Sequence, residues 1–184
     1  HRGGVASIRF PFDWATVQAS PGAAFDWSST DGIVERAVAA GVDALPPLNG
    51  APAWAVPNVP VPAGAGAETS AHLPASGAAA AGWNAFLTKA VERYGPGGAF
   101  WAEHPALPER PIRVWQIWNE PNFRYFVAHP NPAEYGKLVK ASYAALKSAD
   151  PGAKVILGGL YSRPIEATRN YKPPRAFFAT DFLE

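Results

Sequence analysis

Hydrophobic positions along the chain switch between two periods, and this pattern predicts alternating strands and helices. Short apolar runs rich in β-branched residues predict strands over Val5–Phe10, Val42–Leu48, Ile112–Trp118 and Val155–Leu157. Apolar residues at helical spacing predict helices from Ser29-Thr30-Asp31 to Gly41, over Trp83–Tyr94, and from the capping sequence Asn131–Glu134 to Asp150. A last short helix is predicted from about Pro173 to Glu184, and a loop over Pro11–Trp14.

The alternation of strands and helices predicts parallel βαβ units joined by right-handed crossovers. Such units fit two architectures, a small open sheet or part of an eight-stranded barrel. Residues 51 to about 78 are rich in Ala, Pro and Gly and have no periodicity, so they predict a long loop. Loops of this length are usually functional lids or disordered segments.

The composition excludes several classes of function. The chain has 184 residues, of which 48% are hydrophobic and 17% charged, which is typical of a globular domain with a real core. Its formal net charge of +1 gives no reason to expect nucleic acid or an anionic membrane as a partner. No apolar run is long enough to span a bilayer. The absence of cysteine excludes disulfides, thiol catalysis and cysteine-ligated metals.

The beginning of the chain predicts that it comes from something longer. There is no methionine and no signal-peptide pattern, so His1 is interpreted as the product of a cut or of processing. The compartment stays open between secreted and cytoplasmic, with a preference for secreted.

The predicted strand Ile112–Trp118 carries the main functional signal. It leads directly into Asn119 and Glu120, and Pro121 then fixes the turn. A buried strand that ends on a carboxylate presents it at the carboxyl edge of a parallel sheet, where α/β proteins place their chemistry. Glu120 is therefore the candidate catalytic residue.

The segment Val114–Asn122 resembles the fourth-strand signature of clan A glycoside hydrolases, with family 39 as the closest match. The resemblance implies a (β/α)8 barrel that hydrolyses β-linked glycosides with retention of configuration. It implies that Glu120 is the general acid/base and that Asn119 binds the sugar 2-hydroxyl. By the same resemblance, residues 1–184 form a single incomplete barrel domain, a half-barrel of about four parallel strands with flanking helices.

Further segments support the resemblance. Ile8-Arg9-Phe10 resembles the end of the second barrel strand, which implies that Arg9 lies near the nucleophile, and Asp13-Trp14 resembles the following loop. Leu45–Leu48 with Pro52-Ala53-Trp54 resembles the third strand and its aromatic loop, and Ala149–Leu160 resembles the passage to the fifth strand. The match covers strands two to five. The nucleophile, a glutamate at the end of strand seven, has no counterpart, and Asp13 is the only other acid predicted at the carboxyl end of a strand.

Candidate binding residues surround this site. Asn119, Asn122 and Arg9 are predicted to bond sugar hydroxyls or the absent nucleophile, and Asp13 is a further candidate. Three tryptophans fit either a sugar platform or core packing equally well: Trp14, Trp54 and Trp118. Other aromatic and imidazole side chains are predicted to be structural (Trp27, Trp83, Trp101) or at the surface (His72, His104, His129). The histidines lack metal-ligand spacing, so neither a metal nor a cofactor is predicted.

The sequence thus predicts part of a retaining β-glycoside hydrolase whose substrate is a β-linked oligosaccharide or glycoside. The alternative is a non-catalytic carbohydrate-binding half-barrel. Because four parallel strands leave unpaired edges, the expected partners are a second copy of the chain or the missing half of the barrel.

Overall fold

The computed structural model describes residues 3–56, 72–162 and 177–183. All of its strand pairs are parallel. A two-stranded sheet pairs β1 (Ser7–Ile8) with β3 (Asp43–Ala44). A four-stranded sheet has the order β2 (Phe12–Asp13), β4 (Pro47–Asn49), β5 (Val114–Ile117) and β6 (Lys154–Leu157).

The two sheets share their first two chain segments. The segment that contains β1 continues into β2, and the segment that contains β3 continues into β4, so the four predicted strands are all present. Pro11 and Pro46 lie at the two interruptions, where the missing proline N–H weakens a regular ladder. The predicted loop over Pro11–Trp14 is wrong: Phe12 and Asp13 form β2, and Trp14 begins a short helix.

The three long predicted helices are confirmed as α2 (Ser28–Ala39), α3 (Gly77–Tyr94) and α5 (Pro132–Ala149). Helix α5 begins as predicted, with the Asn131 side chain accepting a hydrogen bond from the backbone N–H of Glu134. Helix α2 begins earlier than predicted: its N-cap is Trp27, which makes no side-chain capping bond, and no residue of Ser29-Thr30-Asp31 serves as the cap. Glycine suits the residue after α2, since Gly41 has φ of 72°.

Three short helices complete the described chain: α1 (Trp14–Val17), α4 (Ala99–Glu103) and α6 (Ala179–Leu183). The first two were not predicted, because four or five residues are too few to show a helical period. Helix α6 lies within the last predicted helix, whose expected start falls outside the described residues. Most of the predicted loop at 51–78 also falls outside them, and its end is helical from Gly77.

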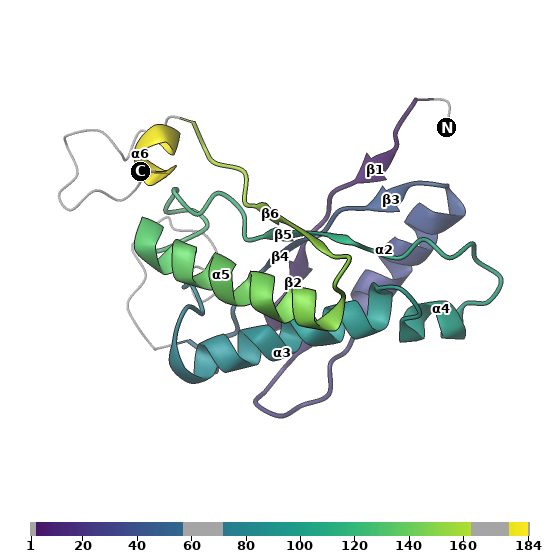
Figure 1. Cartoon of the computed structure of the whole chain (residues 1–184). Coiled ribbons are helices and arrows are strands. Elements are labelled where there is room, and N and C mark those ends of the chain that lie inside the picture. The colour runs from purple at the N-terminus through teal and green to yellow at the C-terminus, as the bar shows by residue number, and fades with distance from the viewer. Residues whose placement is uncertain (1–2, 57–71, 163–176, 184) are drawn as a thin grey trace.

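The strand order decides between the two architectures. Each strand of the larger sheet is added beside the preceding one, in the order of the sequence. Right-handed crossovers then place successive helices on the same face, as in a barrel, whereas a doubly wound sheet reverses its order. Figure 1 shows α3 and α5 side by side along one face of the strands, and Trp83 of α3 donates a hydrogen bond of 2.9 Å to Ser142 of α5. The chain therefore folds as a segment of a (β/α) barrel.

The core is rich in aromatic residues and lies between the strands and these helices. Its largest fully buried side chains come from β2, α1, α3, α4 and β5 and their ends: Phe12, Trp14, Trp83, Phe86, Tyr94, Phe100, Trp115 and Trp118. The outer strand β6 is less protected, with Ile156 and Leu157 exposed by 38% and 51%. Within the described ranges, no helix is long and apolar enough to cross a membrane.

Candidate active site

The backbone after β5 is held in an uncommon conformation. Trp118 has φ of 65° and Glu120 has φ of 39°, and both lie in the left-handed region that side chains larger than glycine seldom adopt. The N–H of Glu120 donates to the carbonyl of Gly159 (3.0 Å), and the N–H of Phe123 donates to the carbonyl of Glu120 (3.0 Å). Such strained residues cluster at active sites, where the surrounding structure holds them in place.

Arg9 ties this strand end to the start of the sheet. It lies between β1 and β2, and its Nε donates to Oε1 of Gln116 at 2.9 Å. Its Nη2 donates to Oδ1 of Asn119 at 2.5 Å. Gln116 in turn donates to the carbonyl oxygen of Trp118 at 2.7 Å. The guanidinium therefore orients the Asn119 amide with its oxygen toward Arg9, which leaves the amide N–H groups for another partner.

The surroundings of Glu120 favour the protonated form of its carboxyl group. Partial burial raises the pKa of Glu120, and the positive charge of Arg9 opposes that rise. A raised pKa keeps a larger fraction of the carboxyl protonated near neutral pH, which is what a proton donor needs.

Asp13 occupies the corresponding end of β2 and is held differently. Its carboxylate accepts a hydrogen bond from the N–H of Thr16 (3.3 Å) and caps α1. It also lies directly against Gly50, where an added Cβ would come within 2.2 Å of the carboxyl atoms. Burial raises the pKa of Asp13, and the backbone N–H groups of Thr16 and Ala15 oppose that rise.

The strand order separates the two carboxyl groups. Strand β4 lies between β2 and β5, so the ends of β2 and β5 are two interstrand spacings, or about 10 Å, apart. Asp13 pairs in register with Asn49 of β4, and the Asn49 Oδ1 is buried without a hydrogen-bond partner in the described chain. The predicted part of Asp13 in substrate binding stays a prediction.

Two of the three tryptophans proposed as sugar platforms lie in the core. Trp14 and Trp118 are exposed by only 0% and 1%. Their indole N–H groups are used internally, since Trp14 donates to Gln18 (2.7 Å) and Trp118 to the carbonyl of Phe126 (3.0 Å). Trp54 is half-buried, lies edge-on to Trp14 at 5.3 Å and donates to the backbone of Gln18. Of the two interpretations, the geometry supports core packing for Trp14 and Trp118.

Asn122 is fully buried, and its amide joins two loops. Its Nδ2 donates to the carbonyls of Tyr161 (2.7 Å) and Phe177 (2.8 Å), and its Oδ1 accepts from the N–H of Tyr161 (3.0 Å). These bonds tie the loop after β5 to the loop after β6. They also occupy the side chain, so the structure does not present Asn122 to a sugar hydroxyl.

The loops joined by Asn122 carry exposed aromatic rings that the sequence interpretation missed. Phe123 stacks on Tyr161 (5.0 Å between centroids, 19° between planes) and on Tyr125 (6.3 Å, 21°). Tyr125 and Tyr161 are exposed by 53% and 44%. The crowding of aromatic residues just after Glu120 is a signal that could have revealed one half of this group.

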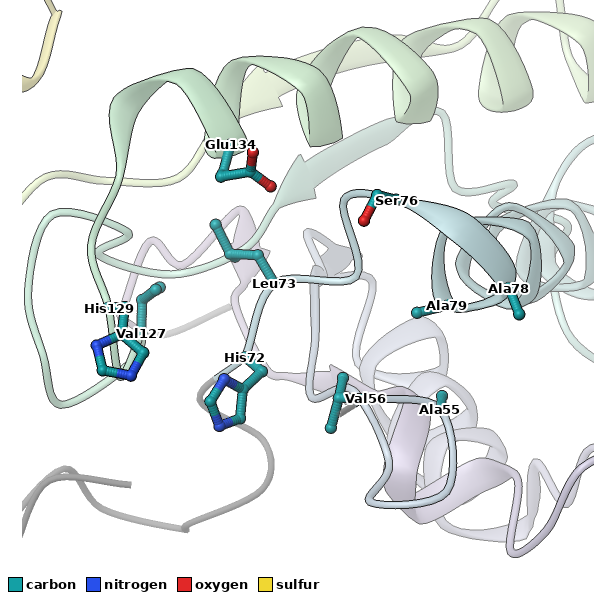
Figure 2. Close-up of a pocket in the computed structure, with 10 residues that line it drawn as sticks. All are labelled: Ala55, Val56, His72, Leu73, Ser76, Ala78, Ala79, Val127, His129 and Glu134. Carbon is teal, nitrogen blue, oxygen red and sulfur yellow. The ribbon is translucent and has the colours of Figure 1, made fainter. Parts of the chain in front are cut away.

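Two of the described histidines line a pocket, and a third packs against an aromatic ring. A pocket of about 490 Å³ opens near the first turns of α3 and α5, with His72, His129 and Glu134 among its lining residues (Figure 2). The two imidazole rings lie 6.1 Å apart, and His72 is half-buried rather than fully at the surface. His104 is also half-buried and stacks on Phe100 at 4.2 Å, whereas His129 is exposed as predicted. Among the described residues, no group of three or more His, Cys, Asp or Glu side chains could hold a metal ion.

Comparison with known proteins supports the fold. No protein-family model and no curated protein matches the chain. Among solved structures, a family 39 glycoside hydrolase from the gut symbiont Bacteroides cellulosilyticus WH2 matches 85% of this chain and 26% of its own, with 23% identity and a TM-score of 0.59. A family 39 β-xylosidase from Caulobacter crescentus matches 82% of this chain and 32% of its own, with 19% identity and a TM-score of 0.53.

A family 39 enzyme from Xanthomonas axonopodis pv. citri matches 71% of this chain and 23% of its own, with 18% identity and a TM-score of 0.51. The chain thus spans between about a quarter and a third of the length of these proteins. At these identities the likeness concerns the fold, and it agrees with the strand order described above. The chain therefore has the fold of part of a (β/α)8 barrel, as found in solved glycoside hydrolases of family 39.

Proposed function

We propose that this chain supplies the acid/base half of a retaining β-glycoside hydrolase. The observation that carries the proposal is Glu120, a carboxyl with a burial-raised pKa on a strained turn at the carboxyl end of a parallel strand. In (β/α)8 enzymes this end of the strands is where catalytic residues lie. The likeness to family 39 structures supports the same assignment.

Glu120, Asn119 and Arg9 each have a part in this mechanism. Glu120 donates its proton to the glycosidic oxygen as the bond to the leaving group breaks, and later accepts a proton from the attacking water. The Asn119 amide, whose oxygen is held by Arg9, turns its N–H groups to the 2-hydroxyl of the sugar. The N–H groups of Arg9 that do not bond Gln116 or Asn119 would bond the second carboxylate.

The covalent step needs a nucleophile that we assign to another part of the protein. A retaining pair has its carboxyl groups about 5–5.5 Å apart. Asp13, at the end of β2, is separated from the end of β5 by an intervening strand and is engaged with α1 and Gly50. The nucleophile therefore comes from the missing half of the barrel or from a second copy of the chain. The exposed outer strand β6, with Ile156 and Leu157, is where further strands would pair.

The test is hydrolysis of an unactivated β-linked disaccharide by the longer parent protein and its Glu120→Gln variant. Xylobiose is the first substrate to try, because one of the matching structures is a β-xylosidase. Loss of the general acid should reduce kcat by about 10²–10⁴. The isolated 184-residue chain should show little or no hydrolysis. Full activity in the Glu120→Gln parent would overturn the assignment.

A carbohydrate-binding half-barrel without catalysis is the second candidate. The exposed rings Tyr125 and Tyr161 favour it, because they could hold a glycan without any help from Glu120. The two candidates differ in one distance, that from Glu120 to a second carboxylate in the full assembly. A carboxylate within about 5–6 Å supports the enzyme, and its absence supports the binding protein.

A further inference from the structure

A buried tyrosine hydroxyl links the ends of the two strands beside the candidate acid/base. The pairing of β5 with β6 ends at Ile117 and Leu157. Just beyond that pair, the hydroxyl of Tyr135 donates to the carbonyl of Ile117 at 2.8 Å. The same hydroxyl accepts a hydrogen bond from the N–H of Gly158 at 2.7 Å. The side chain thus joins the two strands at the point where their own pairing ends.

Tyr135 is itself held in place on all sides. It lies in the first turn of α5, where its N–H donates to the carbonyl of Asn131 at 3.0 Å. The residue is exposed by only 6%, and its ring lies 5.8 Å from that of Phe182 in α6. Burial raises the pKa of Tyr135 to about 12, so the hydroxyl keeps its proton at neutral pH. It therefore serves as a hydrogen-bond donor and acceptor at a fixed position.

Both groups bonded by Tyr135 adjoin the turn that carries Glu120. Ile117 immediately precedes this turn, whose first and last residues have φ of 65° and 39°. Gly158 immediately precedes Gly159, whose carbonyl accepts a hydrogen bond of 3.0 Å from the N–H of Glu120. One hydroxyl is therefore linked to the turn by two routes, through β5 and through the loop after β6.

The backbone of Gly158 packs tightly against the same turn. A Cβ added to Gly158 would come within 3.1 Å of the carbonyl oxygen of Trp118 and of Cδ of Pro121. Contacts as close as these leave the turn little room to move while the hydroxyl bridge is in place. Positive φ at residues other than glycine costs free energy and persists only where the surrounding structure fixes it. The hydroxyl bridge and these contacts supply that constraint.

We propose that Tyr135 is a positioning residue: its hydroxyl holds the turn after β5 in the conformation from which Glu120 protonates the leaving group. This inference rests on the proposed function and extends it to a residue of α5 that acts through the backbone of the turn. Without the hydroxyl, the carbonyl of Ile117 and the N–H of Gly158 lose their shared partner. The turn then relaxes toward ordinary backbone conformations.

The first test follows the backbone of the 184-residue chain and requires no activity. Tyr135→Phe keeps the ring and removes the hydroxyl. Amide hydrogen exchange, followed in ¹H–¹⁵N spectra, should then become about tenfold faster at Gly158 and Glu120. Tyr94→Phe is the matched control, since Tyr94 is fully buried and its hydroxyl makes side-chain hydrogen bonds of 2.6 Å elsewhere in the core. It should leave exchange at both amides within about twofold of the unaltered chain.

The second test measures hydrolysis by the longer parent protein. Xylobiose has a poor leaving group and needs the proton of Glu120, whereas a dinitrophenyl β-xyloside has a leaving group that departs without one. Tyr135→Phe should therefore lower kcat/KM for xylobiose by about 10- to 100-fold and for the dinitrophenyl substrate by less than about threefold. Tyr94→Phe should leave the ratio of the two values unchanged. A purely structural role of Tyr135 would lower both values alike.

Two outcomes would overturn the proposal. One is unchanged hydrogen exchange at Glu120 in Tyr135→Phe, and the other is an equal loss of kcat/KM for the two substrates. Thermal unfolding of both variants shows that a selective loss is not a loss of folded protein. A Glu120→Gln parent that still hydrolyses xylobiose would instead overturn the proposed function, whereas hydrogen exchange would still show whether Tyr135 holds the turn.

Discussion

Glu120 and Asp13 are two carboxyl groups in similar positions with different surroundings. Each lies at the carboxyl end of a parallel strand, and burial raises the pKa of both. Asp13 is engaged by backbone N–H groups and by the close approach of Gly50. In the described chain, the Glu120 carboxylate accepts no hydrogen bond, and the charge that acts on its pKa is that of Arg9. Position at a strand end and a raised pKa mark both groups as candidate acids. The hydrogen bonds that each carboxylate accepts indicate which of the two is free to react.

The largest expected effect concerns the contact that holds Asp13. Gly50→Ala should destabilise the chain by about 3 kcal/mol or more, because it adds a methyl group against the Asp13 carboxyl and a side chain at φ of 73°. Gly22→Ala is the matched control, with φ of 74° and nothing within 4 Å. It should lose about 1–2 kcal/mol from the backbone alone. Urea unfolding measures both, and equal losses would mean that Asp13 moves away from Gly50 at little cost.

Features around Glu120 that depend on neighbouring residues in the sequence could be predicted, whereas features that depend on distant residues could not. The strand ending at Asn119-Glu120-Pro121 was predictable, because a local apolar run and a proline define it. The capping of α5 by Asn131 was predictable for the same reason. The sequence did not predict β2, since two residues beyond a proline show no period.

The side chains around Glu120 were less predictable because long-range packing decides their exposure. Trp14 and Trp118 have the residue type of a sugar platform, but α1 and the loop after β5 turn them into the core. Tyr161 lies 38 residues after Phe123 and meets it only because β5 and β6 are neighbours. The hydrogen bonds of Asn122 to Tyr161 likewise form only because β5 and β6 are neighbours.

The next effect tests whether Arg9 sets the acidity of Glu120. Because the charge of Arg9 lowers the pKa of Glu120, Arg9→Gln should raise that pKa further above its ordinary value. Glu120 must be protonated to act as the acid, so the basic limb of the pH profile of kcat/KM in the parent enzyme should move to higher pH. Arg110→Gln is the control, since it removes an exposed arginine that bonds Asp43 at 2.5 Å instead. An unchanged basic limb in Arg9→Gln would show that Arg9 orients Asn119 without acting on Glu120.

The smallest expected effect is a change in how stability depends on pH. Folding raises the pKa of Asp13, so the folded chain binds this proton more tightly than the unfolded chain. The resulting stabilisation is fully present below the unfolded pKa and is lost as the pH rises through the raised pKa. Asp13→Asn should remove this decline while keeping a side chain that can cap α1.

Urea unfolding between pH 3 and pH 8 would compare the unaltered chain with Asp13→Asn. Asp26→Asn is the opposite-sign control, because the hydrogen bonds from Ser28 lower the pKa of Asp26 and its contribution is lost as the pH falls. If Asp13→Asn leaves the decline intact, the proton is held elsewhere, and the distinction between the two carboxyl groups would then rest on their hydrogen bonds alone. If the decline disappears, Asp13 holds its proton for a structural reason, and the pair then differs in the way the comparison of their partners indicates.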